Sequence, residues 1–405
     1  MLRRSADSNL QPPPHPGMTT LDREKFNLTV TCRAIEVPAK SCTTIMKSLT
    51  KTSTPLFSTL QTKPKTVLPC ESDKSKRTVL LRDDYDLSEF DGSMEEISEK
   101  SLEIALSYKH WSAAQIFRAI FPDDIDDTEV VSAFETIGHI AHLNLKPCHE
   151  PYKKLIGQVI VDKNAAIKTV VNKLQSIHAE YRYFDMELLA GEENFITTSI
   201  EHKIKFKMDF SKVYWNSRLG SEHKRVVDAI PVGSTVLDMF CGIGPFALPL
   251  ARKKCHVHAN DLNPLSYKYL LENVKLNKLS GDYITCYNMD GRDLIKKFEK
   301  QIDFVLMNLP ASATEFLDVF SDLYTGCDKE LSPPTVFCYH FANISDPEQI
   351  SIRAVSEKLG CQIEAKEVHL VRKIAPNTWM TCVKFVVPMA VLKGESSCKR
   401  TKVEM

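Results

Sequence analysis

The chain has 405 residues, and 43% of them are hydrophobic, which is enough for two or three domains with cores of their own. Its 52 basic and 52 acidic side chains cancel, so any phosphate-binding surface has to be a local patch. The 12 cysteines form no Cys-x-x-Cys pair and no apolar run approaches the roughly 18 residues of a membrane span, so we expect a soluble protein of a reducing compartment, without structural zinc or disulfides.

The N-terminal segment is polar and rich in proline, and we expect residues 1–20 to form a disordered or targeting tail. Two early arginines and a serine resemble the start of a mitochondrial transit segment, whereas Asp7 is untypical of one. Met18 offers a second start. A targeting signal and an inert tail are both open alternatives.

Two small domains are predicted next. Residues 21–100 mix short apolar segments with a stretch rich in Lys, Ser, Thr and Pro between Lys47 and Lys65. Within residues 101–205, HWSAAQIFRAIFP has helical spacing and GHIAHLNL alternates as a strand does. We also expect LIGQVIVDKN to be a strand and NAAIKTVVNKLQSI an amphipathic helix, which makes this an α+β domain.

Strands and helices alternate from residue 206 to residue 392. STVLDMF, HVHAND and DFVLMNLP are typical strands, and helical patterns such as NPLSYKYLLENVKLNKL lie between them. Such alternation predicts a mostly parallel, Rossmann-like sheet with helices on both faces. Two antiparallel strands are expected near the end of this block, and residues 393–405 should be a disordered tail.

Two glycines follow the first strand of this block, in TVLDMFCGIGPF. Gly242 and Gly244 let the backbone approach a ligand closely, and the following helix offers free N–H groups. The spacing also resembles the dinucleotide fingerprint, so a nicotinamide enzyme is an alternative. Asp238, at the strand tip, favours a ligand that carries an ammonium group, as S-adenosylmethionine does, over one that carries a pyrophosphate.

Acidic residues also end the next two strands. Asp261 stands where a carboxylate accepts the ribose hydroxyls of an adenosine, and Asp290 stands where an acceptor meets the adenine amino group. Each aspartate alone is typical of a helix cap or a turn. Three in succession at the carboxyl edge of one sheet predict a nucleoside site.

The fourth strand is followed by Asn308, Leu309, Pro310 and Ala311. Proline removes a donor and restricts the backbone, so carbonyl groups and the Asn308 amide can face the edge of a substrate. Methyltransferases of exocyclic amines carry an aromatic residue after this proline. Because Ala311 stands there, we expect a ring nitrogen or another target geometry.

Charged and aromatic residues gather before the first sheet strand, in DFSKVYWNSRLGSEHKRVV. A helix that begins near Ser221 would present Glu222 and His223 in its first turn, facing the cofactor cleft. The alternative is a solvated helix start, in which Glu222 merely complements the helix dipole. These residues alone leave both interpretations open.

In order along the chain, eight segments resemble the Rossmann-type tRNA (guanine-37-N1) methyltransferases of archaea and eukaryotes. They are GHIAHLNL, LIGQVIVDKN, YRYFDMELLAG, DFSKVYWNSRLGSEH, DMFCGIGPFA, ANDLNP, NLPA and VHLVRKIAPN. The first 100 residues match weakly. The resemblance implies a class I methyltransferase domain that transfers a methyl group from S-adenosyl-L-methionine to N1 of guanine 37 in tRNA, which protects the reading frame.

The resemblance also implies roles for single residues. Glu222 would remove the N1 proton of guanine, and Arg182 would meet the negative charge that develops on O6. Asn308 and Pro310 would hold the guanine edge, and Tyr214 would position the flipped-out base. The implied cofactor-binding residues are His223, Asp238, Gly242, Gly244, Asp261, Leu262, Asp290, Gly291 and Asn308. No metal is implied.

The chain departs from the family pattern in three places. Ser217 replaces a common proline, Gly220-Ser221 a common Ser-Thr pair, and Cys241 a frequent alanine, and none of these removes a proposed catalytic group.

Phosphate contacts with the tRNA anticodon stem-loop and body would come mostly from lysines. The candidates, which can equally be merely solvated, are Lys153, Lys154, Lys163 and the lysines from Lys47 to Lys65. We expect a monomer without membrane or stable protein partners, located in the mitochondrial matrix, nucleus and cytoplasm.

Three other functions are open. The aminocarboxypropyl transferase of the wybutosine pathway shares the sheet and the cofactor but should lack the NLPA tetrapeptide. A non-catalytic tRNA-binding relative would have no need of Glu222 or Asn308. A nicotinamide oxidoreductase is disfavoured by Asp238 and by NLPA.

Overall fold

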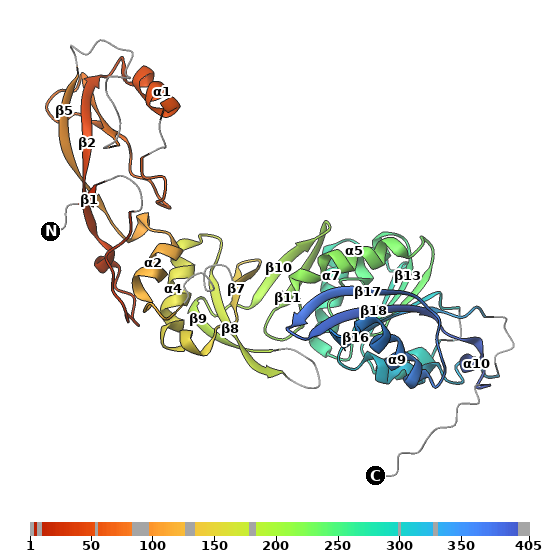
Figure 1. The fold of residues 1–405 in the computed structure, drawn as a ribbon. Coiled ribbons are helices and arrows are strands. Elements are labelled where there is room, and N and C mark those ends of the chain that lie inside the picture. The colour runs from red at the N-terminus through yellow and green to blue at the C-terminus, as the bar shows by residue number, and fades with distance from the viewer. Residues whose placement is uncertain are drawn as a thin grey trace. The chain divides into compact units, whose positions relative to one another are not determined.

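The computed structural model describes residues 4–5, 10–52, 56–82, 97–125, 134–177, 184–298, 301–326 and 331–395. The chain divides into two compact units, whose elements Figure 1 shows. The first unit comprises residues 1–174 and 186–193, and the second comprises residues 175–185 and 194–405. None of the helices in these described ranges is long and apolar enough to cross a membrane.

The first unit begins with a five-stranded sheet around a long central strand, β2. On this sheet, Ile45 of the first helix joins Ile35, Val37, Val79 and Leu81 in a small core. The elements are β1 (Arg4–Ser5), η1 (Arg23–Phe26), β2 (Leu28–Pro38), α1 (Cys42–Thr52), β3 (Val67–Pro69), β4 (Lys76–Leu81) and β5 (Ser98–Leu106).

A four-stranded sheet with two α-helices follows. One core contains buried side chains from both parts, among them Phe26, Trp111 and Ile156, and the indole N–H of Trp111 donates to the Phe26 carbonyl at 2.8 Å. The elements are η4 (Tyr108–His110), α2 (Ala113–Ile120), β6 (Glu135–Ile137), β7 (Ile140–Leu143), η5 (Pro147–Tyr152), α4 (Lys153–Lys163), β8 (Thr169–Ile177) and β9 (Phe184–Gly191). The expected boundary between residues 100 and 101 falls inside β5, and the larger core draws on residues from both sides of it.

Two expected elements of this region have the opposite type. The segment LIGQVIVDKN lies almost wholly in helix α4, where the buried Leu155, Ile156, Val159 and Ile160 follow a helical repeat. The segment NAAIKTVVNKLQSI contains strand β8, which pairs with β7 and has buried β-branched residues where the two strands meet. Both predictions were wrong because short apolar runs fit either periodicity, and strand pairing decided between them.

Residues 10–20 do not form the predicted disordered tail. Leu10 is buried, and its carbonyl accepts a hydrogen bond from Gln115 Nε2 at 2.9 Å. The N–H groups of His15 and Gly17 donate to the carbonyls of Ala119 and Ile120, at 2.6 and 2.9 Å. These bonds satisfy carbonyl groups that the end of α2 leaves without helical partners. Residues 1–3 and 6–9 lie outside the described residues.

A protein that starts at Met18 should therefore be less stable than the full chain. It loses the burial of Leu10, which contributes about 1.5–3 kcal/mol, together with the backbone hydrogen bonds to α2. We expect a lower thermal midpoint for the first unit, and Leu10→Ala in the full chain should reproduce part of the loss. Thr19→Ala, at an exposed position, is the matched control, and equal midpoints of long and short forms would contradict the prediction.

The second unit contains a seven-stranded sheet in the order β14-β13-β12-β15-β16-β18-β17 (Figure 1). The first five strands in this order are parallel to one another, and β18 runs antiparallel to both of its neighbours, β16 and β17. This arrangement confirms the predicted Rossmann-like sheet. The strands are β12 (Thr235–Asp238), β13 (His256–Asn260), β14 (Ile284–Tyr287), β15 (Phe304–Met307), β16 (Thr335–Asn343), β17 (Ala365–Ala375) and β18 (Thr378–Val386).

Helices accompany these strands. Leu317 of η7 and Val355 of α9 pack with Val305 and Val336 of the sheet in one core. The helices are η6 (Ser217–Leu219), α5 (Gly220–Ala229), α6 (Ala247–Arg252), α7 (Pro264–Leu276), α8 (Gly291–Lys296), η7 (Ala313–Phe320), α9 (Pro347–Leu359) and α10 (Met389–Leu392). Residues 396–405 of the expected C-terminal tail lie outside the described residues.

A hairpin, β10 (Ile196–Glu201) and β11 (Ile204–Asp209), also belongs to the second unit. Asn273 of α7 accepts from the Lys207 N–H at 2.7 Å and donates to its carbonyl at 3.1 Å, and Asn277 holds Lys205 in the same way. The expected domain boundary at residue 206 therefore falls inside a hairpin that is hydrogen-bonded to α7 of the second unit. This unit includes the residues from Asn194 onward.

The strand order reverses at the centre of the sheet. From β12 the chain continues to β13 and β14 on one side, and it then crosses to β15 and β16 on the other. In open α/β sheets, ligands bind at the carboxyl ends of the strands where the order reverses. Asp238 ends β12 and Asn308 follows β15, so both residues stand at this point.

Candidate active site

A cavity of about 460 Å³ lies at the carboxyl edge of the sheet in the second unit. Nine residues that were proposed from the sequence line it: Tyr214, His223, Gly242, Asp261, Leu262, Asp290, Gly291, Asn308 and Pro310. Glu222, Asp238 and Gly244 do not line it, and Arg182 lies outside the described residues. The parallel sheet thus brings together side chains from loops that are far apart in the sequence.

The two glycines after β12 serve different purposes. Gly242 lines the cavity with φ +56°, and a Cβ added to it would meet no atom within 4 Å, so it keeps space open for a ligand. Gly244 has φ +98°, and a Cβ there would overlap with the side chain of Leu248. The loop therefore needs glycine for backbone conformation at both positions and for packing at the second.

Asp261 ties this loop to the next one. Its carboxylate accepts hydrogen bonds from the N–H groups of Gly242, at 2.8 Å, and Asn263, at 2.9 Å. Desolvation in the cavity wall raises the pKa of Asp261 to about 6, although these two donors oppose the shift. The carboxylate lines the cavity at the place expected for a ribose.

Several polar atoms near the cavity are buried without a hydrogen-bond partner among the described residues. They are both carboxylate oxygens of Asp238, the indole nitrogen of Trp215 and the amide oxygen of Asn308. Burial, and secondly the charge of Asp261, raise the pKa of Asp238 well above its usual value. Because native proteins rarely leave buried polar groups unsatisfied, these atoms indicate a polar ligand.

The far end of the cavity suits a flat base. Asp290 accepts from the Arg292 N–H at 2.8 Å, so it caps α8 and lines the cavity at the same time. Phe240 and Phe316 form an apolar wall, with ring centroids 4.9 Å apart in an edge-to-face arrangement. An acceptor beside an apolar wall matches an adenine ring. Neither phenylalanine was identified from the sequence.

His223 is oriented by a residue that the sequence did not indicate. Its Nδ1 lies 2.7 Å from Glu201 Oε1, and its ring packs edge-to-face on Phe246 at 4.8 Å. Glu201 belongs to the β10–β11 hairpin, and nothing in the sequence near it marks a functional site. The carboxylate places the imidazole so that its side chain lines the cavity.

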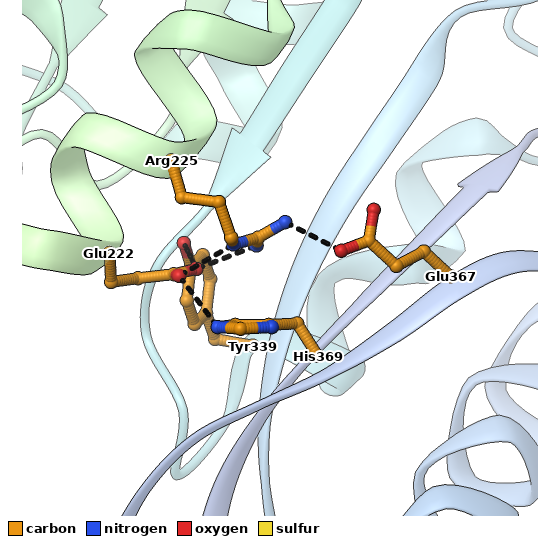
Figure 2. A network of polar contacts seen from close by, with 5 residues as sticks. All are labelled: Glu222, Arg225, Tyr339, Glu367 and His369. Atoms are coloured by element: carbon orange, nitrogen blue, oxygen red, sulfur yellow. Dashed lines mark hydrogen bonds and ion pairs between the residues drawn. The ribbon is translucent and has the colours of Figure 1, made fainter.

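Glu222 does not line the cavity and is 3% exposed. Arg225 binds its carboxylate with two hydrogen bonds, Nε to Oε2 at 2.7 Å and Nη2 to Oε1 at 2.8 Å. The Tyr339 hydroxyl donates to Oε1 at 2.6 Å, and His369 Nε2 lies 3.4 Å from Oε2 (Figure 2). The structure agrees with neither expectation for Glu222. The first turn of α5 faces the cavity through His223, whereas Glu222 neither lines the cavity nor is exposed to solvent.

Two cross-strand rows of side chains explain where Glu222 lies. Tyr339, Cys382 and His369 form one row across β16, β18 and β17, and Glu222 contacts the two outer members, Tyr339 and His369. The cavity is lined by the next row, Phe341, Met380 and Arg372. Two residues along a strand span roughly 7 Å, so the Glu222 network lies next to the row of side chains that lines the cavity.

Three of the lysines proposed for phosphate contacts have partners within the first unit. Lys153 forms ion pairs with Glu150 and Glu187, and Lys154 donates to the Leu188 carbonyl. Lys163 lies over the Tyr108 ring at 3.9 Å, and burial lowers its pKa to about 8. A role in binding phosphate would compete with these contacts, most strongly at Lys163.

The parallel sheet with one antiparallel strand, β18, the glycine loop and the acidic nucleoside cavity define a Rossmann-like S-adenosylmethionine-dependent methyltransferase. Residues 197–371 match the model of the TRM5/TYW2 methyltransferase domain, and residues 114–194 match that of the TYW2 N-terminal domain.

Relatives agree along nearly the whole chain. The tRNA (guanine(37)-N(1))-methyltransferase of Xenopus tropicalis is 40% identical, with 95% of this chain and 83% of that protein aligned, and the human one is 39% identical, with 93% and 77% aligned. The crystal structure of Trm5b from Pyrococcus abyssi has a TM-score of 0.58 at 27% identity and covers 88% of this chain and 99% of that one. The chain therefore belongs to the tRNA (guanine(37)-N(1))-methyltransferase family.

Cofactor binding should weaken on the acid side of neutrality. If the ribose hydroxyls donate to ionised Asp261, affinity falls as protonation removes the charge, and with a pKa of about 6 the ionised fraction drops about tenfold between pH 7 and pH 5. We expect the dissociation constant of S-adenosylmethionine, measured by calorimetry, to rise accordingly. Asp261→Asn should bind weakly at every pH without this dependence, and an equally steep fall in that variant would refute the assignment.

Proposed function

We propose that the protein transfers the methyl group of S-adenosyl-L-methionine to N1 of guanine 37 in tRNA and thereby protects the reading frame. The observation that carries the proposal is the pairing, in one cavity, of a nucleoside pocket with the unpartnered Asn308 amide oxygen beside Pro310 and Ala311. The names of the curated relatives, which specify guanine 37 and its N1 atom, support the same target.

The cavity contains the groups that such a cofactor needs. Bound there, S-adenosylmethionine supplies an electrophilic methyl group on a sulfonium. Asp261 and Asp290 would hold the adenosine, and Asp238, buried beneath the loop, would offset the positive charge of the amino acid end. Trp215, whose indole N–H has no partner among the described residues, can donate to the carboxylate of that end.

The other side of the cavity suits a guanine taken out of the anticodon-loop stack. The Asn308 amide oxygen can accept from the guanine amino group, and Ala311 leaves room for the ring. Tyr214, which is 47% exposed, can pack against the flipped-out base. Glu222 would then take the N1 proton, once one of the donors on its carboxylate gives way.

A cation has to meet the negative charge on guanine O6. The resemblance assigns this role to Arg182, and the structure adds Arg372, which lines the cavity next to Asn216. Arg372→Gln should lower kcat by about 10²-fold, the loss typical of one missing oxyanion donor. Lys373→Gln removes the same charge from the neighbouring exposed position and should leave kcat nearly unchanged. Equal kcat values for the two variants would exclude Arg372 from this role.

The activity can be tested directly. The protein is incubated with unmodified tRNA that carries guanosine 37 and with cofactor labelled in the methyl group, and the nucleosides are then identified after digestion. We expect N1-methylguanosine, and none from the same tRNA with adenosine at position 37. Absence of N1-methylguanosine, or incorporation only from cofactor labelled in the aminocarboxypropyl chain, would overturn the proposal in favour of the wybutosine-pathway transferase.

We also propose that the protein acts as a monomer in the mitochondrial matrix, nucleus and cytoplasm. The resemblance to the family suggests the monomer, and two arginines and a serine near the start of the sequence suggest the mitochondrial location. Fractionation of cells that express the tagged full chain, with the Met18 form as comparison, tests it.

A further inference from the structure

Three donors already fill acceptor positions on the carboxylate of Glu222, and His369 faces the fourth. An ionised carboxylate offers about four lone-pair sites, two on each oxygen. Oε1 receives the Tyr339 hydroxyl and Arg225 Nη2, and Oε2 receives Arg225 Nε and faces His369 Nε2 (Figure 2). A base in this position needs one partner that gives way, and it needs a route by which its proton leaves again.

Only one of these three partners can accept a proton and pass it to water. The guanidinium of Arg225 has no lone pair for a proton. The Tyr339 side chain is fully buried, its hydroxyl donates to Glu222, and burial raises its pKa well above the usual value. The imidazole of His369 has an acceptor nitrogen, and its side chain is 38% exposed. At 3.4 Å, its contact with Oε2 is also the longest of the four.

The position of His369 in the fold supports an exit to solvent. His369 belongs to β17, the edge strand of the seven-stranded sheet. No further strand of that sheet therefore covers the outer side of β17. Two residues earlier on the same strand, Glu367 forms an ion pair with Arg225 Nη1 at 2.9 Å. When Glu222 is protonated, Arg225 therefore keeps a carboxylate partner and is not left as an unpaired, half-buried charge.

We propose that His369 is the group through which Glu222 returns the guanine proton to solvent, an inference that rests on the proposed function. As the N1–carbon bond forms and the carbon–sulfur bond breaks, the sulfonium becomes a neutral thioether and the N1 proton moves to Glu222 Oε2. Neutral His369 then accepts this proton on Nε2, and the imidazolium releases the proton of Nδ1 to water. Glu222 is ionised again, and the imidazole, which now carries its proton on Nε2, returns to the Nδ1–H tautomer by proton exchange with water before the next turnover.

The route has a defined dependence on pH. Protonated His369 pairs with ionised Glu222, fills the acceptor site on Oε2 and cannot take up another proton. Arg225 and Glu367 are the other charged groups that face the pair. Turnover should therefore fall as His369 becomes protonated on the acid side of the profile.

The test separates the first turnover from later ones. The first methyl transfer does not need the exit route, because the proton can stay on Glu222, whereas every later transfer needs Glu222 to have lost that proton. We expect His369→Gln to keep the rate and amplitude of the first turnover and the KM for tRNA, and to lower the multiple-turnover rate about tenfold or more. Added imidazole should restore the later turnovers, and the acid limb of the pH profile should disappear. His340→Gln, on strand β16 of the same sheet, is the matched control and should behave as wild type.

Two results would overturn the proposal for His369: an equal fall of first and later turnovers, which a structural role predicts, or an unchanged multiple-turnover rate. If the proposed function itself is wrong, the experiment gives a different result. In that case wild-type protein forms no N1-methylguanosine even in the first turnover, or Glu222→Gln forms it at the wild-type rate.

Discussion

Glu222→Gln should lower the single-turnover rate of methyl transfer to guanosine 37 by about 10²–10⁴-fold, the range for loss of a general base. A glutamine cannot take the N1 proton, although it fills the same space on α5. The affinity for S-adenosylmethionine should change little, because Glu222 does not line the cavity. Rapid-quench measurement of N1-methylguanosine and calorimetric titration of the cofactor give the two quantities.

The control has to remove a contact of Glu222 without removing its carboxylate. Tyr339→Phe does this, since it deletes only the hydroxyl that donates to Oε1. We expect a loss of about 1 kcal/mol in stability and a methyl-transfer rate that stays well above that of Glu222→Gln. Should both variants lose the same activity, Glu222 would act by holding the network together and not as the base.

Arg225→Met should be the most destabilising single change in this network. Glu222 is 3% exposed, and the Arg225 side chain is 22% exposed, so the pair is poorly screened by water. Removing one partner of a buried ion pair typically costs about 3–5 kcal/mol, because the remaining charge is left uncompensated. We expect the urea midpoint of the second unit to fall accordingly.

The preceding residue provides the control for this prediction. Lys224 pairs with Asp228 at the surface, with both side chains more than half exposed, and Lys224→Met should change stability by less than about 1 kcal/mol. Combining Glu222→Gln with Arg225→Met should recover much of the loss, because the unpaired charge is gone. If Arg225→Met were no less stable than Lys224→Met, the pair would not carry the stability assigned to it.

Local patterns were sufficient for most of the cofactor site. Asp261, Asp290 and Asn308 were identified because each follows an apolar strand, and parallel strands place their carboxyl ends at one edge of the sheet. The same reasoning failed where periodicity is ambiguous: α4 was expected as a strand and β8 as a helix. Leu10 was assigned to a disordered tail because its partners on α2 lie about a hundred residues later.

The sequence by itself determined the class of the sheet, the cofactor and the strand-end residues, since these depend on repeats of two and 3.6 residues and on single positions after each strand. Only the tertiary structure decided what surrounds Glu222. Tyr339 and His369 meet it because the register of β16, β18 and β17 places them in one row, and a shift of a single residue would turn that row to the opposite face of the sheet. Strand register depends on pairing between distant segments, so the sequence around Glu222 carries no sign of its partners or of Arg372 in the cavity wall.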